Sequence, residues 1–269
     1  MKTKHDHSKN HIERYRRQMV LEDWGPATQA RIREARVMVV GCGGLGAPVI
    51  QYLAAAGVGH LTLVDDDRVQ MSNLNRQTLF GTQNLNQAKT EAAEAFVQAL
   101  NPEVTVTLKT ERLGPHNGRA WIRGHHLVFD CTDGLPNKYL LNDICILEKI
   151  PLMHGAVSAW AGQLMCIEPG ESACLRCAFP HMPSPQTVPS CQTVGILGAA
   201  CAVVGSQMAL WGLRRLASNL QWPQGKLWAL DLTTDRRQEL NVMADKQCRV
   251  CGEAAQIDGQ SVEDYENNL

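Results

Sequence analysis

The sequence predicts an α/β fold: a Rossmann-like, mostly parallel sheet flanked by helices and extended by antiparallel strands. Three observations support this prediction. Short β-branched and aliphatic runs alternate with helical segments in the first half of the chain, as in a parallel sheet. The first run, 37–40, ends in the glycine-rich turn Gly41-x-Gly43-Gly44-x-Gly46. Near the C-terminus, 226–231 and 239–243 are two strand-like runs joined by a short connection, as in an antiparallel pair.

Glycines, prolines and apolar runs define the expected elements in chain order. A short helix over 26–34 begins after Gly25-Pro26. Asn101-Pro102 ends a helix over 84–100, because the residue before proline disfavours helical geometry. The apolar runs predict strands at 37–40, 60–64, 104–108, 127–130, 151–154, 162–167, 226–231 and 239–243. The remaining predicted helices are 46–56, 136–148 and 192–217.

The chain of 269 residues is expected to form one domain over 11–252. The polar N-terminus, 1–10, is expected to be disordered. Four prolines between residues 178 and 190 predict a loop that moves over the active site. The segment 253–269 holds five acids and no bases, which predicts a solvated acidic tail.

Composition narrows the class of partner. The net charge of −1 gives no basis for nucleic-acid or membrane-surface binding. The apolar segment 194–213 contains Gln207 and several glycines, which fits a closely packed helix better than a membrane span. Ten cysteines without a signal peptide predict a reducing cytoplasm, where spaced cysteines bind metal or react.

The glycine-rich turn predicts a nucleotide site. Glycine lets backbone N–H groups approach a phosphate at the N-terminus of the following helix. Asp65 ends the next apolar run, where an acid can accept hydrogen bonds from ribose hydroxyls. These features alone favour a dinucleotide, so an NAD-dependent oxidoreductase is one alternative.

Charged residues downstream favour a triphosphate instead. Arg76 and Lys89 supply cations, and Asp133 follows the predicted strand 127–130. Magnesium is usually held by one or two carboxylates together with phosphates. Each residue also has a simpler interpretation: Lys89 on a solvated helix face, and Asp133 as the N-cap of the next helix.

Two Cys-x-x-Cys pairs predict a structural zinc site. Four thiolates satisfy tetrahedral Zn²⁺, and the metal would link two distant segments of the chain. The alternative is a pair of redox motifs. The predicted ligands are Cys174, Cys177, Cys248 and Cys251.

Taken together, these motifs resemble the ThiF/MoeB/HesA family of sulfur-carrier adenylyltransferases, which are related to ubiquitin-activating enzymes. The resemblance covers about Tyr15 to Gly252. It is carried by Arg14-Tyr-Arg-Arg-Gln18, the glycine-rich turn, Asp65-Asp-Asp67, Ser72-Asn-Leu-Asn-Arg-Gln77, Lys89, Asp130-Cys-Thr-Asp133 and the two cysteine pairs.

The resemblance implies ATP-dependent adenylation of the C-terminal glycine carboxylate of a small ubiquitin-like carrier protein ending in Gly-Gly, with release of pyrophosphate. The implied cofactors are ATP, Mg²⁺ and Zn²⁺, and the adenylate is handed to a sulfur donor such as a cysteine desulfurase or a rhodanese-like protein. A ThiS-like carrier for the thiamine thiazole is the first expectation, and a MoeB-type role in molybdopterin biosynthesis is the second.

The resemblance also assigns site residues. Arg17 is expected to reach across a homodimer interface onto the phosphates of the other subunit. Cys191 in Cys191-Gln-Thr-Val-Gly195 resembles the ThiF-type cysteine that links to the carrier, and its alternative is a packing role. Asp133 is expected to hold Mg²⁺. The expected nucleotide-binding residues are Gly41, Gly43, Gly44, Gly46, Asp65, Asp67, Asn73, Asn75, Arg76, Gln77, Lys89 and Asp133.

The sequence departs from the family at two positions. Gly134 stands where asparagine is usual, and Lys138 stands where arginine is usual. Loss of the asparagine amide removes one nucleotide contact, so a lower nucleotide affinity is expected. These departures motivate a further alternative, an inactive scaffold that binds the carrier without chemistry.

Overall fold

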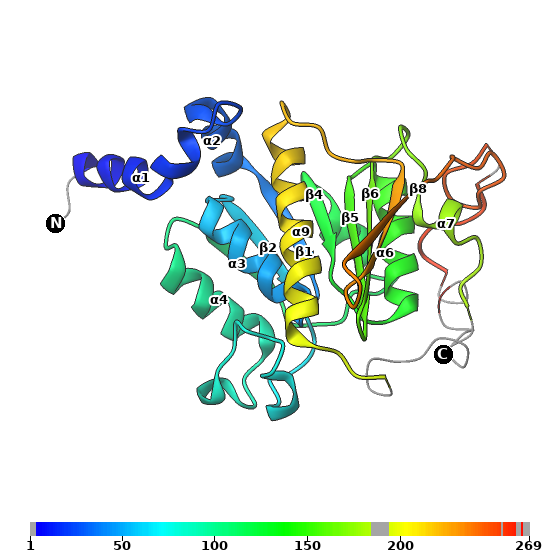
Figure 1. Cartoon of the computed structure of the whole chain (residues 1–269), viewed down its shortest axis with the longest axis horizontal. Coiled ribbons are helices and arrows are strands. Elements are labelled where there is room, and N and C mark those ends of the chain that lie inside the picture. The colour runs from blue at the N-terminus through cyan, green and yellow to red at the C-terminus, as the bar shows by residue number, and fades with distance from the viewer. Residues whose placement is uncertain (1–3, 184–193, 254, 262–264, 266–269) are drawn as a thin grey trace.

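The computed structural model describes residues 4–183, 194–253, 255–261 and 265, with side chains from residue 12 onward. Its centre is one eight-stranded sheet of order β3-β2-β1-β4-β5-β6-β7-β8 (Figure 1). The strands are β1 Arg36–Val40, β2 His60–Val64, β3 Thr105–Lys109, β4 Leu127–Asp130, β5 Leu152–Ser158, β6 Ala161–Ile167, β7 Lys226–Asp231 and β8 Arg236–Asn241.

The pairing between neighbouring strands changes type once across the sheet, from parallel to antiparallel. From β3 to β5 all neighbours are parallel, and from β5 to β8 all neighbours are antiparallel. The predicted fold class, a mostly parallel sheet extended by antiparallel strands, is therefore confirmed. The predicted strands match within a few residues. The runs that predicted β1, β2 and β4 are almost wholly buried, whereas β8, at the edge of the sheet, is exposed along its whole length.

Helices cover both faces of the sheet. Along β1, Val37 and Val39 pack with α2, α3, α4 and α9, whereas Met38 and Val40 pack with α5 and α6. This alternation follows from the two-residue period of a strand, and both faces are apolar because both are covered. The helices are α1 Lys4–Met19, α2 Gly25–Glu34, α3 Gly46–Ala56, α4 Lys89–Leu100, α5 Gly118–Ile122, α6 Leu135–Glu148, α7 Leu175–Ala178 and α9 Gly198–Ala217.

The topological switch point of the sheet lies between β1 and β4. β1 pairs with β2 on one side and with β4 on the other, so the loops that follow β1 and β4 leave the same edge next to each other. The Cys131 N–H donates to Val40 O at 2.9 Å and the Gly41 N–H donates to Val64 O at 2.8 Å. Ligands of open α/β sheets bind at this position.

Helix α9 runs across the front of the sheet in Figure 1 and explains the apolar, glycine-containing segment. A Cβ atom at Gly205 would lie 2.4 Å from Pro48 Cγ and 2.7 Å from Leu45 O, so glycine lets α9 approach α3 closely. None of the described helices is long and apolar enough to cross a membrane.

Two predicted helices differ from expectation near their N-terminal ends. The helix expected over 84–100 begins at Lys89, because 86–89 instead hydrogen-bond to the backbone of 67–69. In the helix expected over 192–217, Val194 is helical, but residues 195–197 interrupt the helix, because Ile196 pairs with Ala159 as an isolated bridge, and α9 begins at Gly198; residues 192 and 193 lie outside the described residues. Both differences arise from backbone pairing with residues distant in the sequence. The local spacing of apolar residues gives no information about such pairing.

The two ends of the chain also differ from expectation. Helix α1 begins at Lys4, within the range 1–10 for which disorder is expected. At the other end, the acidic segment 253–269 is not wholly solvated, since Ile257 and Tyr265 are each 3% exposed. These two apolar side chains pack against α6, which the acidic composition of the segment obscures. The domain boundaries themselves stay predictions.

Candidate functional site

The glycine-rich loop after β1 is pressed against the loop after β4. Gly41 has φ +96°, and a Cβ atom there would lie 2.5 Å from Cys131 O. A Cβ atom at Gly46 would lie 2.0 Å from Gly41 O. A larger residue at Gly41 would push the two loops apart, and one at Gly46 would clash inside the glycine-rich turn itself, so backbone contacts explain the predicted need for glycine.

The N-terminus of α3 fits a phosphate. Its first turn carries no acidic residue, and its N-cap, Leu45, makes no side-chain capping hydrogen bond. The first N–H groups of a helix lack partners within the helix and form a positive end. The loop and the helix therefore have the chemistry of a phosphate site.

Asp65 ties the glycine loop to the end of β2. Its carboxylate accepts hydrogen bonds from the Cys42 N–H at 2.7 Å and from the Asp67 N–H at 2.9 Å. Burial raises the pKa of Asp65, although nearby Lys89 and the two backbone N–H groups oppose this. Asp65 thus shapes the loop in this structure, and its contact with ribose stays a prediction.

Lys89 is held beside Asp65 by a second carboxylate. Its Nζ lies 2.7 Å from Asp67 Oδ2 and 3.8 Å from Asp65 Oδ1, and the residue is 6% exposed. Burial opposes its charge, but Asp65 and Asp67 outweigh burial and raise the pKa of Lys89. The interpretation of Lys89 as a solvated helix residue is therefore wrong, and its cation lies next to the glycine loop.

Arg76 lies over the glycine loop from the segment after η1 (Met71–Asn73). A Cβ atom at Gly44 would lie 3.6 Å from Arg76 Cγ. The Arg76 guanidinium donates to Ser72 O at 2.9 Å and to Asn75 Oδ1 at 3.1 Å. Asn73 has a local role, since its Oδ1 accepts the Gln70 N–H at 3.2 Å.

Gln77 provides an independent indication of a ligand. The residue is 4% exposed, and its Oε1 is buried without a hydrogen-bond partner among the described residues. Its Nε2 lies 3.5 Å from where a Cβ atom of Gly43 would stand. An unpaired buried acceptor is costly, so a site that brings a donor, such as a ribose hydroxyl, fits this position.

Asp133 is exposed in the loop after β4, where a carboxylate can reach a metal held by phosphates. The alternative N-cap role is not realised, because the N-cap of α6 is Gly134 without a side-chain cap. Arg17 is exposed in the last turn of α1. Cys191 lies outside the described residues.

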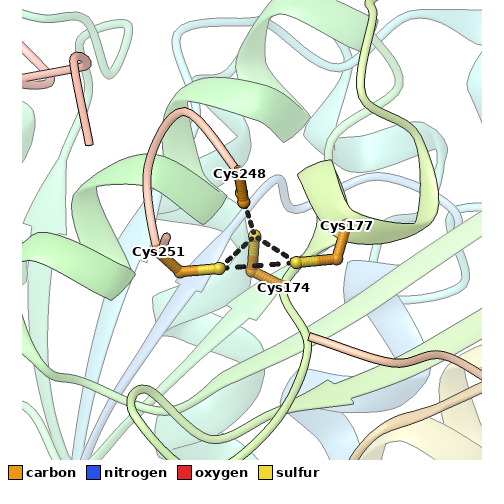
Figure 2. Close-up of side chains that lie close together, drawn as sticks. All are labelled: Cys174, Cys177, Cys248 and Cys251. Atoms are coloured by element: carbon orange, nitrogen blue, oxygen red, sulfur yellow. Dashed lines mark hydrogen bonds between the residues drawn. The ribbon is translucent and has the colours of Figure 1, made fainter. Parts of the chain in front are cut away.

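The two cysteine pairs meet at one point (Figure 2). Sγ–Sγ distances are 3.8 Å for Cys174–Cys177, 3.6 Å for Cys174–Cys248, 3.4 Å for Cys177–Cys251 and 3.5 Å for Cys174–Cys251. A tetrahedral zinc ion with Zn–S bonds of about 2.3 Å sets its sulfurs about 3.8 Å apart. A hydrogen bond from the Cys174 thiol lowers the pKa of Cys248 to about 4. The geometry therefore fits the predicted Zn²⁺ site.

A buried ion pair connects this cysteine cluster to α6. Arg176, inside the first Cys-x-x-Cys, donates from Nη2 to Asp143 Oδ2 at 2.8 Å and from Nε to Oδ1 at 2.9 Å. Tyr265 donates to Asp143 Oδ2 at 2.9 Å, and the guanidinium carbon of Arg176 lies 4.8 Å from the Tyr139 ring centroid. Local sequence gives no signal for this pairing, since Arg176 and Asp143 are far apart in the chain.

We expect about one zinc ion per chain, held by the four cysteines. Cys248→Ser should lower both zinc content and thermal stability, because it removes one of four ligands. Cys145→Ala, which changes a buried thiol outside the cluster, should keep full zinc content. Metal analysis of freshly purified, unchelated protein checks this, and less than about a tenth of an equivalent in the unmodified chain would refute the site.

We expect Arg176→Met to destabilise the fold by about 3–5 kcal/mol, because it leaves the fully buried Asp143 carboxylate without its cation. Urea unfolding at neutral pH measures this. Lys246→Met is the matched control, since Lys246 and Glu253 form an exposed pair at 3.4 Å that contributes little. Equal unfolding midpoints for the two variants would contradict the role assigned to Arg176.

Comparison with known proteins identifies the family of this chain. Residues 15–250 match the model of the ThiF family. A sulfur carrier protein adenylyltransferase from Thermus thermophilus is 41% identical over 251 residues, covering 91% of this chain and 93% of that protein. A SAMP-activating enzyme E1 from Haloferax volcanii is 40% identical, covering 95% of this chain and 93% of that protein.

More distant matches extend the likeness. The adenylyltransferase and sulfurtransferase MOCS3 of Drosophila sechellia is 37% identical over 89% of this chain, which spans 53% of that protein. The crystal structure of Escherichia coli MccB with MccA-N7isoASN superimposes with a TM-score of 0.75 at 19% identity, covering 84% of this chain and 69% of that chain, which shows a shared fold. The family match and the two relatives aligned over nearly their whole length establish that this chain belongs to the ThiF family.

Proposed function

We propose that this chain catalyses ATP-dependent adenylation of the C-terminal carboxylate of a small ubiquitin-like sulfur-carrier protein. A carboxylate oxygen forms a bond to the α-phosphorus of ATP, the bond from that phosphorus to the bridging oxygen breaks, and pyrophosphate leaves. The observation that carries the proposal is the contact between the glycine-rich loop and the loop bearing Asp133, with Arg76 and Lys89 beside it.

This reaction needs positioning and charge neutralisation more than a protein nucleophile. The N-terminus of α3 and the cations of Arg76 and Lys89 would bind the phosphates. Arg76 offers a planar fork and Lys89 a point charge. Asp133 would hold Mg²⁺, which would supply further neutralisation of phosphate charge when bound. Lys89 must exchange its contact with Asp67 for a phosphate oxygen.

The carrier is the finer part of the proposal. We propose a ThiS-like carrier of the thiamine thiazole pathway, with the sulfur carrier of molybdopterin synthase as the alternative. A cysteine desulfurase or a rhodanese-like protein would supply the sulfur. The names of the Thermus and Haloferax relatives support a carrier-activating role in general. We place the reaction in the cytoplasm, where the cysteine cluster stays reduced.

The proposed assembly is a homodimer with composite sites. Arg17 is exposed in the last turn of α1, at the end of this projecting helix that adjoins α2 (Figure 1). We propose that the Arg17 guanidinium reaches the second copy and contacts the phosphates of the nucleotide bound there.

Cys191 is proposed to act after adenylation. Its sulfur would form a covalent link to the acyl carbon of the carrier, with AMP as the leaving group. Adenylation itself requires only that the carboxylate and phosphate be held in line, which no thiol assists.

With a carrier ending in Gly-Gly, we expect the protein to exchange labelled pyrophosphate into ATP. Arg76→Ala, Lys89→Ala and Asp133→Ala should each lower the rate by roughly 10²-fold or more, the scale of one preorganised charge contact. The exposed control Lys246→Met should keep the rate. Full exchange in all three site variants would show the assignment to be wrong.

The same assay separates the alternative functions. An NAD-dependent oxidoreductase would bind NAD and release no pyrophosphate. An inactive scaffold would bind ATP and the carrier without exchange.

Composite sites predict recovery of activity by mixing. Arg17→Ala and Lys89→Ala homodimers should each be inactive, since every site lacks one cation. Unfolding and refolding them together should restore about a quarter of the unmodified rate, because half of the dimers then contain one intact site. A mixture as inactive as its components would contradict a shared site.

Cys191→Ala should keep pyrophosphate exchange and lose the covalent carrier adduct. Intact mass spectrometry after incubation with carrier, ATP and the sulfur donor detects the adduct. An adduct that persists in Cys191→Ala would show that another cysteine does this work. Loss of exchange together with the adduct would instead assign Cys191 a packing role.

A further inference from the structure

A carboxylate, an ammonium and an imidazole are buried together beneath the loop that follows β4. Asp130 ends β4 and is fully buried, Lys138 lies on α6 with 6% exposure, and His154 lies on β5 with 2% exposure. The cluster therefore joins two strands and a helix at the switch point of the sheet. None of the residues reaches the solvent side of the site.

The polar atoms of the cluster satisfy one another. Lys138 Nζ donates to Gly155 O at 2.7 Å and lies 3.3 Å from both Asp130 oxygens. His154 Nδ1 donates to Asp130 Oδ2 at 2.7 Å. Burial alone would raise the pKa of Asp130, but the Lys138 charge and the His154 hydrogen bond outweigh it and hold that pKa below its ordinary value. Burial lowers the pKa of His154, although its hydrogen bond to Asp130 opposes this.

The Asp130 carboxylate also holds the loop that follows β4. Asp130 Oδ1 accepts the Thr132 hydroxyl at 2.7 Å and the Thr132 N–H at 3.1 Å. Thr132 lies between Cys131, whose carbonyl contacts Gly41, and Asp133. A change in the orientation of Asp130 would therefore move both sides of the proposed nucleotide site.

Stability alone does not account for such a cluster. Burying an ion pair removes two charges from water, and apolar residues of similar size stabilise a fold at least as well. What the charged cluster provides is a fixed direction, because a carboxylate bonded on both oxygens has one orientation. The cluster is thus better explained by the geometry of the loop it supports.

We propose that Lys138, Asp130 and His154 are positioning residues that fix the 131–133 loop relative to the glycine-rich loop. The inference rests on the proposed function for its effect on rate. Its structural part, the ordering of the loop, stands independently of which reaction the site performs.

Thr132→Val tests the proposal most sharply, because it removes the hydroxyl link to the loop and leaves the buried ion pair in place. The rate of pyrophosphate exchange should fall about 10-fold or more, the scale of one hydrogen bond to a charged group. Amide hydrogen exchange in a peptide spanning 129–134 should accelerate by a similar factor. Lys138→Met should show both effects more strongly, and Lys138→Arg should restore most of the rate because it restores the cation.

Thr62→Val is the matched control. Thr62 is also buried and bonds to a histidine, with Oγ1 2.8 Å from His125 Nε2, but it lies on β2 away from the loop. It should change neither the rate nor the amide exchange of 129–134. If Thr132→Val matches Thr62→Val in both measurements, the positioning role is overturned, even where Lys138→Met fails to fold. If the unmodified protein fails to exchange pyrophosphate into ATP, the proposed function is wrong. The amide hydrogen exchange of 129–134 then tests the positioning role by itself.

Discussion

The backbone contact between Gly41 and Cys131 is the constraint on which the rest of the site depends. It exists because β1 and β4 are parallel neighbours at the point where the strand order reverses, so their loops leave the sheet side by side. A Cβ atom at Gly41 would come within 2.5 Å of Cys131 O, so the contact tolerates only glycine there. The helix N-terminus that follows one loop and the carboxylate of Asp133 on the other are thereby held against a common space.

The cysteine cluster joins chain segments that follow the antiparallel strands of the same sheet. The four cysteines connect the segment after β6 to the segment after β8, and Arg176 joins this cluster to Asp143 on α6. Helix α6 also carries Lys138, which reaches Asp130. Helix α6 therefore contacts both the cysteine cluster and Asp130, which holds the loop after β4. Packing of α6 links the antiparallel half of the sheet to the parallel half that carries the proposed nucleotide site.

Much of this structure could be predicted from the sequence, and the exceptions share a cause. Strands such as 60–64 and the helix 46–56 are bounded by glycine or polar turns. The spacing of apolar residues within them is that of a strand or a helix, so they were predictable. The late start of α4 at Lys89 and of α9 at Gly198 depends on backbone pairing with residues far away in the chain. His154 lies in an apolar strand, and no spacing marks it as a partner of Asp130. The cysteine pairs were predictable because metal chemistry fixes their spacing.

We propose that the loops after β1 and β4 form one site for a nucleoside triphosphate. Amide hydrogen exchange with and without Mg²⁺-ATP tests it most directly, because it follows each loop separately. We expect slower amide exchange in both 41–46 and 130–134 with Mg²⁺-ATP, and no change in either segment with NAD. Slower exchange in only one of the two segments, or equal protection by NAD, would contradict it.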